Sequence, residues 1–175
     1  MTIKQTATYT TADMDAFRDP NKINSHFGLP LPQAARVFSI SLNAEGKSNV
    51  HQARFRRHYF GNTWAYRYIK KQHPDAWIWD ERYRFNSALS IVRDPRMIKA
   101  QIEFIRLMGT DRLSKIRMKA LALNLKSDSL TDGKPDLAVH FPSKTDLPWK
   151  FFEIKLPNDP LTPNQLGWLK VLSDI

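Results

Sequence analysis

Two short apolar runs near the end of the chain constrain its fold more than any other part of the sequence. Residues 136–141 (Asp-Leu-Ala-Val-His-Phe) and 149–154 (Trp-Lys-Phe-Phe-Glu-Ile) are separated by a segment rich in Pro, Ser, Lys and Asp. Apolar, aromatic runs of this length, bounded by turn residues, are typical of β-strands joined by a surface loop. If they pair as an antiparallel hairpin, the start of the first strand lies beside the end of the second, and Asp136 faces Glu153.

The alternation of side chains along a strand places a lysine at the same point. Glu153 and Lys155 are two residues apart and share one face, whereas Ile154 points to the other face. Two converging carboxylates form a hard oxygen site suited to Mg²⁺ or Mn²⁺, with a backbone carbonyl and waters completing the shell. The lysine can orient or help to deprotonate a water, or neutralise charge on a phosphate. The pattern therefore indicates metal-dependent phosphodiester hydrolysis.

Residues 133–139 (Gly-Lys-Pro-Asp-Leu-Ala-Val) and 151–169 (Phe-Phe-Glu-Ile-Lys-Leu-Pro-Asn-Asp-Pro-Leu-Thr-Pro-Asn-Gln-Leu-Gly-Trp-Leu) resemble the VRR-NUC (virus-type replication-repair nuclease) domain of the PD-(D/E)xK superfamily. The likeness extends to the catalytic domain of Fanconi-associated nucleases and to VRR-NUC antibacterial toxins. It implies an α/β, restriction-endonuclease-like core, in which a small mixed sheet is flanked by helices. It also implies that Asp136, Glu153 and the Ile154 carbonyl bind the metal, Lys155 is the catalytic lysine, and Gln165 lies at the rim of the site.

The resemblance further implies a glutamate from an upstream helix, often in a Glu-Gly setting. Glu45, which precedes Gly46, is the best match, and Glu81 and Glu103 are the alternatives. Members of the family usually continue beyond the Gln helix into a last hydrophobic strand, whereas this chain stops at Ile175. We therefore expect a sheet that is one strand short or is completed by another chain.

Gln165 has two interpretations. Thr162 and Gln165 have the spacing of a capping box, with Pro163 at the first helical position and Leu161 and Leu166 placed as a hydrophobic staple. Gln165 either caps only the start of the helix or has a direct role near the metal or phosphate. The sequence leaves both interpretations open.

The positive charge is concentrated in the middle of the chain. Residues 51–130 contain 17 Lys and Arg against 7 Asp and Glu, which accounts for the whole net charge of +10. Cations alternate with aromatic residues there, a composition that tracks phosphates and stacks on unpaired bases. The alternative is an amphipathic helix with core-facing aromatics and solvated arginines. The predicted DNA-binding residues are Arg54, Arg56, Arg57, Arg67, Lys70 and Lys71.

The remaining pattern predicts a single domain over residues 1–175. Residues 1–35 read as a loosely packed arm with a short helix at 12–18, residues 36–130 as a strand and a basic helical insertion, and residues 131–175 as the catalytic motif. Within the middle region we expect a strand at 36–42, a helix at 48–72, a strand at 77–79 and two helices split near Gly109. Thr110 or Asp111 is the candidate cap of the second of these helices.

Composition excludes other classes of function. The chain has no cysteine, hence no disulfide framework and no thiolate zinc site. No apolar run approaches the roughly 18 residues of a membrane span, and nothing indicates a nucleotide cofactor. The five histidines lack metal-ligand spacing, and His140 reads as structural.

The sequence thus predicts a Mg²⁺- or Mn²⁺-dependent deoxyribonuclease that acts in the cytoplasm or is delivered into target cells without a conventional signal peptide. Three settings stay open: a repair or phage-type structure-specific nuclease, an interbacterial toxin, and a non-catalytic DNA-binding module that keeps the fold. The second would have an acidic immunity protein as partner, because a strongly basic domain attracts acidic proteins as well as DNA.

Overall fold

The computed structural model describes residues 9–18, 50–79, 83–86, 95–125, 133–146, 148–155 and 159–173. Side chains within helices at residues 17–18, 50–59, 63 and 95–97 fall outside that description. The helices are α1 (Thr11–Arg18), α4 (Val50–Gln72), α5 (Pro95–Met108), α6 (Thr110–Ala122) and α7 (Pro163–Leu172). The strands are β1 (Trp77–Trp79), β2 (Leu137–His140) and β3 (Trp149–Phe152).

The described strands form one antiparallel sheet in the order β1-β2-β3. β2 and β3 are the predicted hairpin, which is confirmed with Leu137 opposite Phe152 and His140 opposite Trp149. β1 pairs with the other edge of β2, with Trp77 opposite His140. The described part of the sheet is therefore entirely antiparallel, and the mixed sheet stays a prediction that depends on residues outside it.

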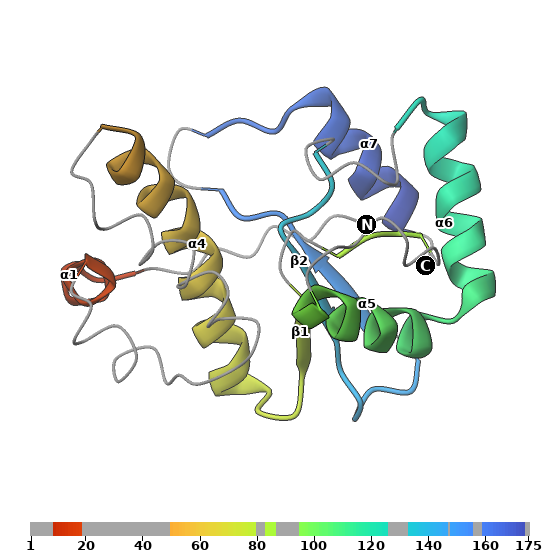
Figure 1. Ribbon diagram of the computed structural model, residues 1–175, viewed down its shortest axis with the longest axis horizontal. Coiled ribbons are helices and arrows are strands. Elements are labelled where there is room, and N and C mark those ends of the chain that lie inside the picture. Colours follow the sequence, from red (N-terminus) through yellow and green to blue (C-terminus); the bar gives the residue numbers. More distant parts are fainter. Residues whose placement is uncertain are drawn as a thin grey trace.

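Both faces of this small sheet are covered by helices, which gives three layers (Figure 1). Leu137 and Val139 of β2 pack with Phe60, Tyr66 and other residues of α4. Ala138 points the other way, toward a cluster that draws residues from α5, α6 and α7. Because side chains alternate across a strand, a strand buried on both faces must be apolar throughout. This explains why Leu-Ala-Val is uninterrupted by a polar residue.

Aromatic packing dominates the face covered by α5, α6 and α7. The Trp79 ring lies 5.5 Å from Phe104 and 5.4 Å from Trp149, measured between ring centroids. Phe85 stacks on Trp168 at 5.1 Å. Trp79 also donates from Nε1 to the Ala100 carbonyl at 2.8 Å, which ties β1 to α5. This cluster forms the core between the sheet and helices α5, α6 and α7.

The predicted helices are confirmed, but the predicted cap of α6 is wrong. The long basic helix is α4, and the two later helices are split at Gly109, as expected. Gly109 itself is the N-cap of α6, with φ 81°, and no side chain caps the helix start. A single residue with positive φ turns the chain from α5 into α6, so Thr110 and Asp111 already lie inside the helix and cannot cap it.

The described part of the predicted N-terminal arm, residues 9–18, contains α1, which contacts α4 through the buried residues Asp13 and Ala16. Asp13 is buried and accepts from the Thr10 N–H at 2.8 Å, while its own N–H donates to Thr10 Oγ1 at 3.2 Å, a reciprocal pair of bonds at the start of α1. Its carboxylate also accepts from Arg67 Nη1 at 2.5 Å and from Trp64 Nε1 at 3.3 Å, both on α4. A buried carboxylate needs several donors, and Asp13 finds them on a helix that is distant in sequence. The predicted strand at 36–42 lies outside the described residues.

Candidate active site

The two motif carboxylates meet at one end of the β2–β3 hairpin. Leu137 pairs with Phe152, so the residues beyond them, Asp136 and Glu153, stand opposite each other. The Ile154 N–H donates to Asp136 Oδ2 at 2.7 Å, which extends the contact between the two segments past the last ladder pair. The predicted convergence of Asp136 and Glu153 is confirmed by this register.

Glu153 lies in an environment that disfavours its charge. Its side chain is only 7% exposed. Burial and, after it, the neighbouring Asp136 carboxylate raise the pKa of Glu153, and Lys155 lowers it, with a net result of about 7. Removing a carboxylate from water and placing a second one beside it both favour the neutral acid. The negative charge of Asp136 and Glu153 is therefore only partly neutralised by the single ammonium group of Lys155.

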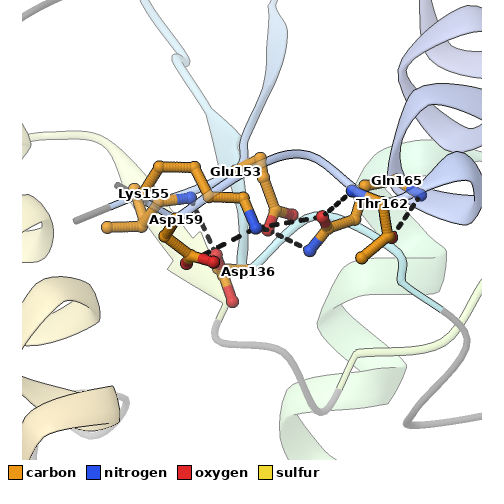
Figure 2. A network of polar contacts seen from close by, with 7 residues as sticks. Asp136, Glu153, Lys155, Asp159, Thr162 and Gln165 are labelled. Atoms are coloured by element: carbon orange, nitrogen blue, oxygen red, sulfur yellow. Dashed lines mark hydrogen bonds and ion pairs between the residues drawn. The ribbon is translucent and has the colours of Figure 1, made fainter. Parts of the chain in front are cut away.

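Lys155 and Gln165 complete a polar network around Glu153 (Figure 2). Lys155 Nζ lies 3.4 Å from Glu153 Oε1 and donates to Gln165 Oε1 at 3.0 Å. Gln165 donates in turn from Nε2 to Glu153 Oε1 at 2.5 Å. Lys155 thus shares the Glu153 side of the chain, as the alternation predicted, although the regular strand ends at Phe152.

Gln165 serves the start of α7, as one interpretation predicted, and also contacts Glu153 and Lys155, while its role at a metal or phosphate stays a prediction. Thr162 and Gln165 form a reciprocal capping box at the start of α7, and Pro163 occupies the first turn. Gln165 Oε1 accepts from the Thr162 N–H at 2.8 Å while the amide nitrogen contacts Glu153. The predicted staple partners Leu161 and Leu166 are 38% and 53% exposed, so neither is buried by the helix start.

A glycine before β2 lets this loop approach the start of α7. Gly133 has φ 73°, a conformation that residues with a side chain rarely adopt. A Cβ at this position would lie 3.0 Å from Asn164 Cβ and 3.2 Å from the Gln165 nitrogen. The glycine of the Gly-Lys-Pro-Asp motif therefore supports the position of Gln165 as well as the turn into Asp136.

Asp159, for which the sequence predicted no role, also contacts the network. Its Oδ2 lies 3.5 Å from Lys155 Nζ, and its side chain is 54% exposed. Asp159 contributes to the raised pKa of Glu153, after burial and Asp136. The spacing of four residues between Lys155 and Asp159 is the only sequence feature that hints at this contact. Outside a helix, such a spacing does not predict the direction in which a side chain points.

The upstream acidic ligand remains a prediction. Glu45 and Glu81 lie outside the described residues. Glu103 lies on α5, where it pairs with Arg106 Nε at 2.9 Å. Among the described residues, no group of three or more His, Cys, Asp or Glu side chains is placed to hold a metal ion. Metal binding by Asp136, Glu153 and the Ile154 carbonyl likewise stays a prediction.

The predicted DNA-binding residues differ in their surroundings. The side chains of Arg54, Arg56 and Arg57 lie outside the described part of α4. Arg67 is engaged with the buried Asp13, and Lys70 Nζ donates to the Pro74 carbonyl at 2.8 Å. Lys71 is exposed near the end of the helix. The aromatic residues Phe60 and Tyr66 of α4 are core residues, as the amphipathic-helix interpretation predicted.

His140 lies at the opposite end of β2 from Asp136. Its ring packs against Trp149 at 5.0 Å between centroids. Burial lowers the pKa of His140, and Arg106 and Arg112 lower it further. This location, away from the carboxylate pair, agrees with a structural role.

The chain matches a known protein family. The VRR-NUC domain matches residues 69–174, which is more than half of the 175-residue chain. No curated protein and no solved structure matches the chain. None of the described helices is long and apolar enough to cross a membrane.

Proposed function

Because the chain belongs to the VRR-NUC domain family, a family of nucleases, we propose that it hydrolyses phosphodiester bonds of DNA with the help of Mg²⁺ or Mn²⁺. One observation carries the proposal: Asp136 and Glu153 face each other at the end of the hairpin, with Lys155 Nζ 3.4 Å from Glu153 Oε1. This arrangement of two acids and a lysine is the one that a PD-(D/E)xK nuclease requires.

The chemistry of the donor set fits a divalent cation. Glu153 is nearly buried, and the neighbouring Asp136 is one cause of its raised pKa. Two carboxylates with this mutual repulsion are favourable ligands for a hard cation, which would replace the proton that Glu153 holds near neutral pH. We propose Asp136, Glu153 and the Ile154 carbonyl as ligands, with Glu45 as the further acid. When bound, the cation would supply a Lewis acid that polarises the phosphate and lowers the pKa of a water.

The residues of the chain itself supply alignment and charge. Lys155 is 23% exposed, so its ammonium group can reach a phosphate while it stays tethered to Gln165. Gln165 orients Glu153 and Lys155 together because its Nε2 donates to Glu153 and its Oε1 accepts from Lys155. A preorganised group of this kind stabilises developing charge without rearrangement during the reaction.

A cleavage assay tests the proposal directly. We expect the purified chain to cut plasmid, flap or single-stranded DNA in Mg²⁺ or Mn²⁺, and to be inactive in EDTA. The Asp136→Ala variant is the matched control for a contaminating nuclease and should be inactive in every condition. Cleavage that persists in EDTA or in Asp136→Ala would contradict a metal-dependent site here. DNA binding without cleavage of any of these substrates would favour the alternative, a non-catalytic DNA-binding module.

The biological setting, either a structure-specific repair or phage-type nuclease or an interbacterial toxin, needs a separate test. Expression in bacterial cells distinguishes the two settings, because an active toxin without its acidic immunity protein kills the host. Asp136→Ala should remove that toxicity if it arises from cleavage. Normal growth with an active wild-type chain would favour the repair setting.

A further inference from the structure

A buried tyrosine from another part of the chain contacts the peptide that leads into Asp136. Tyr83 is 3% exposed, and its hydroxyl donates to the Pro135 carbonyl at 2.9 Å. Burial raises the pKa of Tyr83 well above its ordinary value, and the charges of Asp136 and Glu153 raise it further. The phenol is therefore a permanent hydrogen-bond donor within the field of the two carboxylates.

Tyr83 is itself held rigidly. Its ring packs against Phe85 at 5.3 Å and against Phe104 at 5.2 Å, measured between centroids. The backbone of the next residue, Arg84, is bound by the buried Gln101 of α5. Gln101 Oε1 accepts from the Arg84 N–H at 3.0 Å, and Gln101 Nε2 donates to the Arg84 carbonyl at 2.8 Å. The Tyr83 ring thus has a fixed position relative to Phe104 and Gln101 of α5.

Lys134 covers the same tyrosine from the motif side. Its side chain is buried with the residue only 6% exposed, and Nζ lies 4.9 Å from the centroid of the Tyr83 ring. Pro135 is fully buried. The segment that precedes Asp136 is therefore attached to Tyr83 by a carbonyl hydrogen bond and by a cation–π contact.

These contacts determine where the Asp136 carboxylate can lie. A peptide unit is planar, so the direction of the Pro135 carbonyl also sets the plane of the Asp136 N–H and Cα. At its other end, the Asp136 side chain is held by the Ile154 N–H at 2.7 Å. We propose that Tyr83 is a positioning residue of the site, which holds the Pro135–Asp136 peptide so that the Asp136 carboxylate faces Glu153 in a geometry that binds a divalent cation. This inference rests on the proposed function.

The test is the Tyr83→Phe variant, which keeps the ring and removes the hydroxyl. Titration calorimetry of the EDTA-stripped, dialysed full chain with Mn²⁺ should show binding about 10-fold weaker than wild type, the scale for loss of a partner behind a metal ligand. DNA binding in EDTA should stay within about twofold of wild type, because phosphate contacts rather than the carboxylates supply that affinity. Cleavage should lose most at low Mn²⁺ and recover as Mn²⁺ rises.

Tyr66→Phe is the matched control. Tyr66 is a core residue of α4, 4% exposed, and its buried hydroxyl has no hydrogen-bond partner among the described residues. Burial alone raises the pKa of Tyr66, without a contribution from either motif carboxylate. Removing this hydroxyl should leave Mn²⁺ affinity unchanged. An equal loss in both variants would mean that any buried hydroxyl matters, and would overturn the positioning role.

The remaining outcomes separate the inference from the proposed function. Wild-type Mn²⁺ affinity in Tyr83→Phe, with binding lost in Asp136→Ala, overturns the inference and leaves the nuclease site intact. Wild-type protein without Asp136-dependent Mn²⁺ binding overturns both. Lys134→Met is a second variant in case Tyr83→Phe does not fold, and it should weaken Mn²⁺ binding by about threefold or more, the scale of a cation–π contact. Unchanged affinity in that variant would overturn the inference when Tyr83→Phe does not fold.

Discussion

Gln165 joins the start of a helix to a carboxylate: its Nε2 donates to Glu153 Oε1 at 2.5 Å, while its Oε1 accepts from the Thr162 N–H at 2.8 Å. A capping residue normally satisfies only the first turn of its own helix. Here the same amide also bridges Glu153 and Lys155, so the start of α7 is joined directly to both residues.

Gln165→Glu separates the two roles. A glutamate still accepts from the Thr162 N–H, but it places a negative charge against Glu153 in place of a donor. We expect cleavage to fall by about 10-fold or more, the scale for a partner of a metal ligand. Thr162→Ala is the control, which removes a cap bond, costs about 1 kcal/mol of stability and should leave cleavage within a few-fold of wild type. Equal rates in Gln165→Glu and wild type would mean that only the capping role matters.

The stability of the metal-free protein should depend on the charge of Glu153. Its pKa is raised from 4.5 to about 7 on folding, so the folded state binds this proton more tightly than the unfolded state. The associated stability is fully present below pH 4.5 and is lost as the pH rises through about 7. In EDTA, the free energy of unfolding of Glu153→Gln relative to that of wild type should therefore be higher at pH 8 than at pH 5. Denaturant unfolding at the two pH values measures this difference, and a pH-independent offset would contradict it.

Two glycines with positive φ provide a matched pair for testing the loop before β2. Gly133→Ala and Gly109→Ala should each cost about 1–3 kcal/mol of stability, because both positions have a positive φ that residues with a side chain rarely adopt. A Cβ at Gly133 meets Asn164 and Gln165, whereas a Cβ at Gly109 meets nothing within 4 Å. Only Gly133→Ala should therefore reduce cleavage beyond the loss of folded protein. The measurement is the cleavage rate per folded molecule, and equal rates in both variants would show that Gln165 tolerates the shift.

The motif residues should affect chemistry more than binding. Asp136→Ala and Glu153→Ala should abolish cleavage, and Lys155→Ala should lower the rate by roughly 10²-fold or more. DNA affinity should stay close to wild type, because the excess positive charge lies in residues 51–130. Residual cleavage within a few-fold of wild type in either carboxylate variant would contradict the proposed site.

Arg67 and Lys71 on α4 should have different effects. Arg67 binds the buried Asp13, so Arg67→Gln should destabilise the attachment of α1 and lower thermal stability. Lys71 is exposed, and Lys71→Gln should weaken DNA binding and reduce the salt slope by about 1 if it contacts a phosphate. Thermal unfolding and DNA titrations at several salt concentrations test the pair. A normal salt slope for Lys71→Gln would remove it from the predicted DNA-binding set.

The local sequence pattern was sufficient to predict those helices, strands and caps that depend only on residues close together in the chain. Periodicity and turn residues predicted α4, β1, the helices on either side of Gly109 and the hairpin. The hairpin register then brought Asp136 opposite Glu153, because side chains alternate with a fixed period along a strand. Thr162, Pro163 and Gln165 predicted the start of α7 because a capping box depends on local spacing alone.

Tertiary packing decided the rest, because the relevant partners are far apart in sequence. Arg67 could be read as a DNA contact until α1 brought Asp13 to it, and no spacing rule links the two. The capping box predicted the start of α7 but not the contact between Gln165 and Glu153. That contact forms because the folded chain places α7 beside the end of the hairpin. Tyr83 and Pro135 are 52 residues apart, and no sequence pattern links them, so their hydrogen bond could not be predicted. The raised pKa of Glu153 likewise arises from burial and from Asp136 across the hairpin, which are properties of the folded chain.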